Sequence, residues 1–139
     1  MVRTKPVVVF YVDDNPKSSR VLSSILRRCG FEVITSNDPV EALETCEAIN
    51  FDVALLDYEM PKMRGPELAQ EIKFLLPDLP VVLISGKISL PASDLTFVDA
   101  HFGAGTDLDE LVERLRTLVL PKCTLENVSR SFAPWAEST

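Results

Sequence analysis

Three carboxylates that could act together follow two apolar runs. Asp13 and Asp14 follow the run over residues 7–12, and Asp57 follows the run over residues 53–56. If both runs are neighbouring parallel strands, their carboxyl ends meet at one edge of a sheet and the three side chains converge. Crowded carboxylates raise each other's pKa and repel one another unless a cation joins them. Because hard oxygen ligands with room for water suit Mg²⁺, the three aspartates predict a magnesium site.

Each aspartate also has a simpler interpretation. Asp is common at turns, so Asp13 and Asp14 could merely cap the following helix, and Asp57 could merely cap the following loop. The joint placement at two strand ends, each after an apolar run, favours the metal site over three unrelated caps.

Strands and helices alternate along the chain. Runs with strand character cover residues 7–12, 31–35, 52–57, 81–84 and 98–102. Short links between alternating strands and helices imply right-handed crossovers, and hence a parallel sheet with helices on both faces. The predicted fold class is therefore α/β, a doubly wound five-stranded parallel sheet.

Helices are predicted from capping signals and helical spacing. Asn15 is expected to cap the first helix, Gly30 to stop it, and Asp38 to open the second. A third helix is predicted over residues 67–76, a short one behind Pro91, and a last one that begins with a capping box from Thr106 to Asp109. The side chains expected to face the core from the later helices are Val40, Leu43, Cys46, Leu68, Ile72, Leu75, Leu108, Leu111, Val112, Leu115, Leu118 and Val119.

Composition limits the kinds of protein that the chain can be. Its 139 residues suit one domain, and a net charge of −7 with scattered basic residues argues against nucleic-acid binding. The first apolar run is too short for a signal peptide or a membrane span, so we expect a cytoplasmic protein without membrane attachment.

The cysteines and the C-terminal segment carry no chemistry of their own. Three cysteines and one histidine lack metal-ligand spacing, which excludes a zinc site or a disulfide framework, and Cys29 and Cys46 are expected to be buried inert thiols. Residues 121–139 are polar and without a period. We expect a domain over residues 1–120 and a flexible tail over residues 121–139.

Three segments carry a resemblance to a known family. They are Val-Asp-Asp-Asn at 12–15, Leu-Leu-Asp-Tyr-Glu-Met-Pro-Lys-Met-Arg-Gly at 55–65, and Val-Val-Leu-Ile-Ser-Gly at 81–86. In this order they resemble the receiver domains of bacterial two-component response regulators. The resemblance implies a flavodoxin-like sheet with strand order 2-1-3-4-5 and a stand-alone signalling module.

The resemblance also implies a role for each matching residue. Asp57 would accept a phosphoryl group, as the nucleophile that attacks a kinase phosphohistidine. Mg²⁺ would be held directly by Asp14, Asp57 and the backbone carbonyl of Glu59, and partly through water by Asp13. Ser85 would be the hydroxyl that turns towards the phosphate.

The last strand departs from the family pattern. The family lysine that binds phosphoryl oxygens aligns with Ala104, the following proline with Gly105, and the switch aromatic with His101. We expect metal binding to survive and coupling to the distal face to weaken. Lys87 is either a solvated surface lysine or a partial replacement that pairs with Glu59 and controls water access. His101 is equally consistent with a half-buried packing residue and with a switch.

Two functions stay open at this point. A phosphorelay receiver would act through a sensor histidine kinase or phosphotransfer protein and a downstream protein target, with homodimerisation as an alternative. A pseudo-receiver would be an interaction module that is independent of phosphorylation, because the lysine position holds Ala104. An aspartyl phosphatase or a flavin protein fits poorly, since the acid pair lacks Asp-x-Asp spacing and the chain has only five glycines. We expect no enzyme activity beyond self-phosphorylation and autodephosphorylation.

Overall fold

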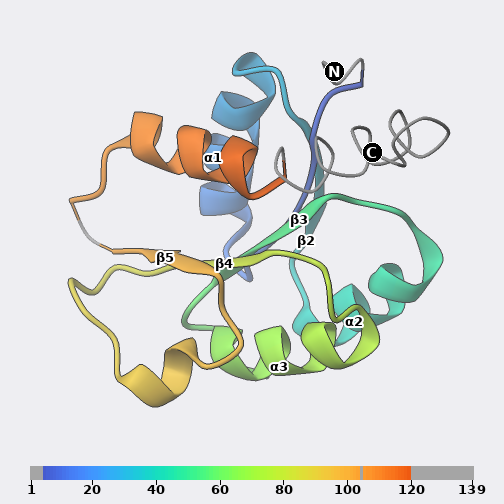
Figure 1. The fold of residues 1–139 in the computed structure, drawn as a ribbon, viewed down its shortest axis with the longest axis vertical. Coiled ribbons are helices and arrows are strands. Elements are labelled where there is room, and N and C mark those ends of the chain that lie inside the picture. The colour runs from blue at the N-terminus through green and yellow to red at the C-terminus, as the bar shows by residue number, and fades with distance from the viewer. Residues whose placement is uncertain (1–4, 104, 120–139) are drawn as a thin grey trace, which may run out of the picture.

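Five parallel strands form one sheet in the order β2-β1-β3-β4-β5, which confirms the predicted fold class and strand order (Figure 1). The computed structural model describes residues 5–103 and 105–119. The strands are β1 (Val8–Val12), β2 (Glu32–Ser36), β3 (Val53–Asp57), β4 (Val81–Ile84) and β5 (Ala100–Phe102). The helices are α1 (Pro16–Arg28), α2 (Pro39–Ala48), α3 (Gly65–Leu75), the single-turn 3₁₀ helix η1 (Ala92–Leu95) and a helix over residues 108–119.

The register of the sheet brings the candidate residues to one edge. β3 lies between β1 and β4, and all of these strands run parallel, so their carboxyl ends meet. Asp57 pairs with Ile84. Ser85, one residue further along, and Asp13, directly after β1, therefore lie at the same edge as Asp57.

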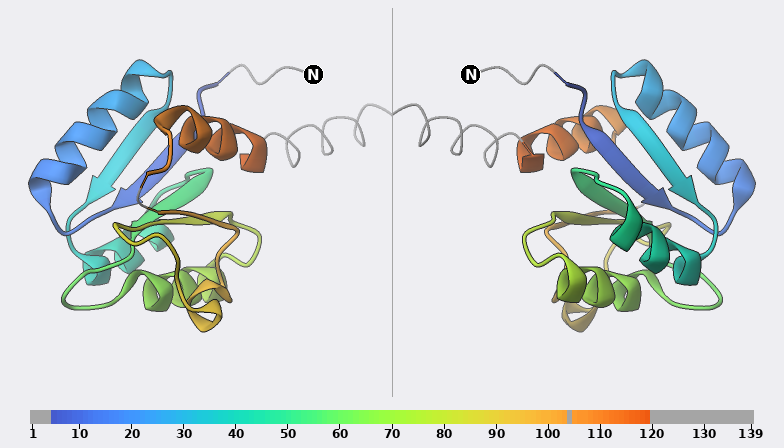
Figure 2. Two further views of the ribbon diagram at one scale, coloured as in Figure 1. Left: turned by 90° about the vertical axis from the view of Figure 1, so that its left-hand side faces the viewer. Right: turned by 90° about the vertical axis from the view of Figure 1, so that its right-hand side faces the viewer.

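Helices cover both faces of the sheet (Figure 2), and apolar side chains form one core on each face. The helices α2 and α3 cover one face with Ala42, Cys46, Leu68, Ala69 and Ile72. The helix α1 and the helix over residues 108–119 cover the other face with Leu26, Leu111, Leu115 and Val119. Successive residues of a strand alternate between the two cores, which explains why β1 and β3 are continuous apolar runs.

The starts of α1 and α2 follow the sequence signals, whereas α3 begins at Gly65 instead of residue 67 and the last helix has a different cap. Asn15 caps α1 and Asp38 caps α2 through side-chain oxygens. The capping box predicted from Thr106 is wrong, because the oxygen that accepts the N–H of Asp109 belongs to Asp107, at 3.2 Å. An aspartate two residues before an N–H can close a local Asx turn, and Asp107 directly precedes the helix.

Two side chains predicted to face the core lie at the surface instead. Val40 is 50% exposed and Leu75 is 37% exposed. The buried positions of α2 follow the i, i+3, i+7 spacing of Pro39, Ala42 and Cys46, so Val40 points away from the sheet. Leu75 is the last residue of α3, and Leu76 and Leu79 beyond it pack against the core in its place.

The segment between β4 and β5 is short of regular structure. Behind Pro91 it forms only the single turn η1, as predicted. It passes so close to Gly103 that a Cβ at that position would collide with the carbonyl oxygen of Lys87. Glycine at 103 therefore lets the segment after β4 lie directly against the end of β5.

The remaining expectations have mixed outcomes. Cys46 is buried, as predicted, and burial raises the pKa of its thiol to about 11. Cys29 is only half-buried, so the prediction is wrong there.

The predicted tail over residues 121–139 lies outside the described residues. Within residues 5–103 and 105–119, no helix is long and apolar enough to cross a membrane.

Candidate functional site

The three aspartates converge at the carboxyl edge of the sheet, as the sequence predicts. Asp13, Asp14 and Asp57 each offer a carboxylate oxygen, and these oxygens all lie within 4.8 Å of one another. Asp13 is 4% exposed, whereas Asp14 and Asp57 are half-buried. The carboxylates therefore share a site that is partly shielded from water.

Asp13 is held by hydrogen bonds to its side chain and to its backbone. The Tyr11 hydroxyl donates to Asp13 Oδ2 at 2.6 Å, and the Asn15 N–H donates to Asp13 Oδ1 at 2.9 Å. The Asp13 N–H donates to the Ser36 carbonyl, and Asn37 Nδ2 donates to the Asp13 carbonyl at 2.7 Å. Burial, together with the bond to Asp13, raises the pKa of Tyr11, so the phenol keeps its proton and acts as the donor.

Burial and the neighbouring carboxylates disfavour the charged form of Asp57. Burial raises the pKa of its carboxyl to about 7, and the charges of Asp13 and Asp14 contribute to the increase. The backbone N–H groups of Tyr58 and Glu59 act in the opposite direction. Near neutral pH, the metal-free site therefore holds Asp57 in a mixture of its charged and neutral forms.

The donor set fits a hard divalent cation. All three side chains offer oxygen, which is the ligand that Mg²⁺ prefers, and Mg²⁺ usually takes one or two carboxylates and keeps several waters. Burial and, after it, the charges of Asp13 and Asp14 raise the pKa of Asp57, and a bound cation would oppose the effect of those charges. The loop that begins at Tyr58 also brings the backbone of Glu59 next to Asp57.

Ser85 lies beside the carboxylates. Its N–H donates to the Phe102 carbonyl at 3.0 Å, which ties it to β5. Its Oγ accepts the N–H of Lys87 at 2.9 Å. Ser85 and Asp57 line one open groove of about 510 Å³, which also borders α1. The hydroxyl predicted to turn towards Asp57 is therefore within the same groove.

Two residues depart from the family pattern near the last strand, and the structure describes His101 of these two. His101 is half-buried in β5 and pairs in register with Leu83, whose side chain belongs to the core under α2 and α3. Parallel neighbours in register point to the same face, so His101 lies on that side of the sheet. Ala104 lies outside the described residues.

Lys87 reaches Glu59, as hypothesised from the sequence. Its Nζ lies 3.5 Å from Glu59 Oε2 and 5.6 Å from the centre of the Tyr58 ring. Both charged side chains are more than half exposed, at 55% and 72%. An exposed pair of this kind contributes little to stability, so its significance is its position over the loop after Asp57.

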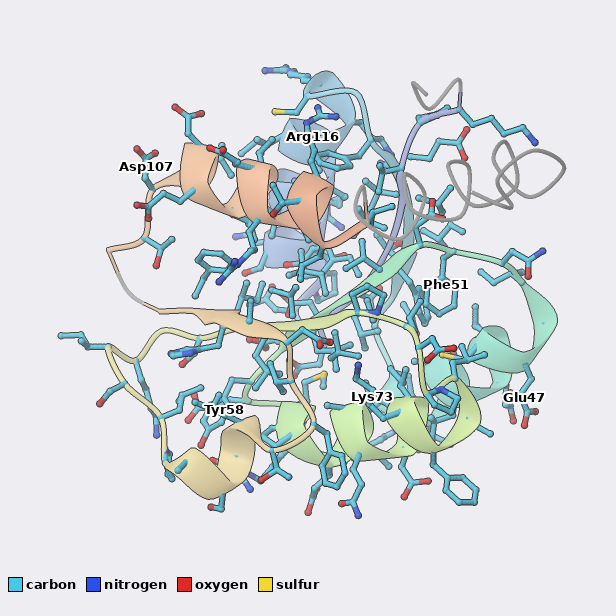
Figure 3. All side chains as sticks on the ribbon, in the orientation of Figure 1. Glu47, Phe51, Tyr58, Lys73, Asp107 and Arg116 are labelled. Carbon is cyan, nitrogen blue, oxygen red and sulfur yellow. The ribbon has the colours of Figure 1, made fainter. Side chains whose placement is uncertain are left out.

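A second network surrounds the Tyr58 hydroxyl. Tyr58 is 5% exposed and donates to Asp94 Oδ2 at 2.5 Å, while Arg64 Nη2 donates to the Tyr58 oxygen at 2.8 Å and to Asp94 at 2.7 Å. Figure 3 shows Tyr58 next to the segment that carries η1. The residue directly after Asp57 is thus tied to the segment after Ser85.

Another groove lies away from this chemistry. It has a volume of about 770 Å³ and is lined by residues 46–51 and 75–79, at the opposite ends of the strands. Because no cluster of carboxylates opens into it, we assign the chemistry to the aspartates at the carboxyl edge.

Comparison with known proteins identifies the family. The family model for the response regulator receiver domain matches residues 9–101. The chain belongs to this family, whose members are the receiver modules of two-component signalling. Receiver domains are signalling modules rather than enzymes. The match ends three positions before Ala104.

Individual relatives agree with this assignment. The chain is 30% identical over 122 residues to the probable transcriptional regulatory protein TcrX of Mycobacterium tuberculosis, covering 83% of this chain and 50% of that protein. The chain thus spans about half the length of that relative. It is 28% identical to the response regulator TrrA of Thermotoga maritima in complex with Mg²⁺-BeF, with a TM-score of 0.75 over 81% of this chain and 98% of that one. TrrA has also been solved in complex with the histidine kinase ThkA, where the TM-score is 0.74 at 29% identity over the same shares of both chains.

Two tyrosine hydroxyl groups have roles that the sequence patterns do not predict. The Tyr11 hydroxyl bonds to Asp13 in the carboxylate site, and the Tyr58 hydroxyl bonds to Asp94 outside it. A buried tyrosine usually finds a hydrogen-bond partner, and residues two apart on a strand share a face. That spacing could have connected Tyr11 with Asp13. The bond between Tyr58 and Asp94 joins positions far apart in the chain, and no local signal indicates it.

Proposed function

We propose that the chain is the receiver of a two-component phosphorelay and accepts a phosphoryl group on Asp57 with Mg²⁺ bound. The observation that carries the proposal is the convergence of Asp13, Asp14 and Asp57 within 4.8 Å at the carboxyl edge of a receiver fold. The structures of TrrA, with Mg²⁺-BeF and with a histidine kinase, support it. The phosphodonor would be a sensor histidine kinase or a phosphotransfer protein.

Asp57 supplies the nucleophile in this proposal. One of its carboxylate oxygens bonds to phosphorus while the bond between phosphorus and the donor's histidine nitrogen breaks. Asp14, Asp57 itself and the backbone carbonyl of Glu59 would hold Mg²⁺ directly, and Asp13 would hold it partly through water. When bound, the ion supplies positive charge that stabilises the transferring phosphoryl group. The neighbouring aspartates would then no longer favour protonation of Asp57, and its carboxylate would be free to attack.

Other residues act after the transfer. Ser85 would turn its hydroxyl towards a phosphoryl oxygen. His101, at the position of the family's switch aromatic, would change its orientation together with that hydroxyl. Because Ala104 stands where the family has lysine, the phosphoryl group lacks one cation. We assign part of the role of that lysine to Lys87. Together with Glu59, Lys87 would limit the access of water to the phosphoryl group and so set the lifetime of this group.

The proposed organisation is a receiver domain over residues 1–120 followed by a C-terminal segment over residues 121–139, acting in the cytoplasm. The phosphorylated domain would signal to a downstream protein target, or through a homodimer. The net charge of −7 supports a protein partner over a nucleic acid.

A second candidate is a pseudo-receiver, and the alanine at position 104 favours it. Such a module would bind its partners without phosphorylation. The intact set of aspartates and Ser85 favours the first candidate, because a domain that needs no phosphoryl group needs no cluster of repelling carboxylates.

Phosphorylation by a small donor separates the two candidates. The purified chain is incubated with acetyl phosphate and Mg²⁺, and its intact mass is measured. We expect an adduct of one phosphoryl group that requires Mg²⁺ and is absent in Asp57→Asn. Asp78→Asn, which removes an exposed carboxylate at the other end of the sheet, should form the adduct like the wild type. Absence of the adduct from a wild-type chain that binds Mg²⁺ would favour the pseudo-receiver.

A further inference from the structure

Tyr11 is the penultimate residue of β1 and is 1% exposed. Its ring belongs to the core under α1 and the helix over residues 108–119. A phenol at such a depth loses its contact with water, so its hydroxyl needs a partner within the protein. That partner is Asp13 Oδ2 at 2.6 Å, two residues further along the same face of the strand.

The hydroxyl completes a two-point attachment of the Asp13 carboxylate. Oδ1 accepts the N–H of Asn15 at the start of α1, and Oδ2 accepts the hydroxyl of Tyr11 from the core. The two donors come from different elements, so together they fix the rotation of the carboxylate. A carboxylate has about four lone-pair positions. Each oxygen of Asp13 therefore keeps a position for a cation or for a water bound to one.

We propose that Tyr11 is a positioning residue that orients Asp13 for Mg²⁺; this inference rests on the metal site of the proposed function. Without the hydroxyl, Asp13 Oδ2 loses its donor in a buried place next to Asp14 and Asp57. The carboxylate is then free to rotate, and ordering it again opposes metal binding. Side chains that hydrogen-bond to metal ligands typically contribute about 10–100-fold to metal affinity.

The alternative is that Tyr11 only fills the core. In that case removal of the hydroxyl lowers the stability of the metal-free protein and leaves the affinity for Mg²⁺ unchanged. Tyr58 offers a matched control, because it is the other buried tyrosine and its hydroxyl bonds to Asp94 instead of a metal-site aspartate. Tyr58→Phe removes the same group from a place outside the metal site.

The test measures Mg²⁺ affinity by calorimetric titration of the full chain, as wild type, Tyr11→Phe and Tyr58→Phe. We expect Tyr11→Phe to bind Mg²⁺ about tenfold or more weakly and Tyr58→Phe to stay within about twofold of the wild type. Equal affinity of Tyr11→Phe and wild type would overturn the role of Tyr11 and leave the metal site standing. No binding by the wild type would overturn the metal site itself, and the role of Tyr11 with it.

A spectroscopic signature separates positioning from packing. Mg²⁺ at Asp13 changes the charge next to the Tyr11 hydroxyl, so we expect a tyrosine difference spectrum on Mg²⁺ addition in the wild type and in Tyr58→Phe. The spectrum should be lost in Tyr11→Phe. A difference spectrum that persists in Tyr11→Phe and disappears in Tyr58→Phe would contradict the assignment.

Discussion

Replacement of Asp57 by asparagine should stabilise the metal-free protein, and increasingly so as the pH rises. Burial and the neighbouring charges of Asp13 and Asp14 raise the pKa of Asp57 from 3.8 to about 7 in the folded state. Between these values the folded protein keeps a proton that the unfolded chain has lost, so the free energy of unfolding falls as the pH rises. Above about pH 7 both states are ionised and the destabilisation is constant.

The structure sets the size of this effect. One pH unit of difference between the two pKa values corresponds to about 1.4 kcal/mol, so the interval from 3.8 to about 7 allows at most about 4 kcal/mol. Asp57 is only half-buried, and water screens part of the repulsion, so we expect about 2 kcal/mol. Asp57→Asn should therefore match the wild type near pH 4 and exceed its stability by about 2 kcal/mol at pH 8.

Urea unfolding in the presence of EDTA, at several pH values, measures this difference. Asp38→Asn is a control of opposite sign: the hydrogen bonds from Lys62 and Val40 lower the pKa of Asp38, so its stabilisation is present at neutral pH and is lost as the pH falls. Mg²⁺ at 100 times its Kd should add about 2.7 kcal/mol to the wild type and less to Asp57→Asn. A difference between wild type and Asp57→Asn that is independent of pH, or that grows as the pH falls, would refute the account from burial and repulsion.

Three further predictions concern the segments around Asp57. Lys87→Ala should shorten the lifetime of the phosphoryl group several-fold, as followed by intact mass after removal of acetyl phosphate. Glu59→Gln should shorten it too if the two side chains work as a unit. Unchanged dephosphorylation rates in both variants would contradict a role of this ion pair. Tyr58→Phe should speed amide hydrogen exchange over residues 92–95 about fivefold, because one net hydrogen bond is lost. Unchanged exchange would show that the hydrogen bonds around the Tyr58 hydroxyl do not hold η1 in place. Gly65→Ala should lower the free energy of unfolding by about 1–3 kcal/mol, because its Cβ would lie 2.5 Å from the carbonyl oxygen of Asp57. Gly86→Ala, whose Cβ meets nothing within 4 Å, is the control, and equal losses in both would contradict the close contact.

The sheet could be predicted because its signals are local. Strand β4 has the predicted bounds, and the other strands differ from the prediction by one or two residues at their ends. Helical positions were less predictable, because Val40 and Leu75 follow a helical period and yet lie at the surface. Val40 points away from the sheet and Leu75 is the last residue of α3, so tertiary packing decides which face of each helix is buried.

The candidate site divides in the same way. Convergence of Asp13 and Asp57 follows from parallel strands that end at one edge, so alternation and topology were enough to predict it. The hydrogen bond from Tyr58 to Asp94 depends on the path of the segment after β4, which has little regular structure to predict. The pair of Glu59 and Lys87 was predicted because the resemblance places both residues over the same loop.

The two sides of the site differ in how firmly they are held, and the difference indicates where a phosphoryl group can be sensed. On the β1 side, the buried Tyr11 hydroxyl and the Asn15 N–H fix Asp13. On the β4 side, the contacts run between loops, and the ion pair of Glu59 and Lys87 is largely exposed. Exposed loop contacts open at lower free energy than buried strand contacts. We therefore expect the response to a charge on Asp57 to concentrate in the segment from Gly86 to η1, while β1 and Asp13 keep their positions.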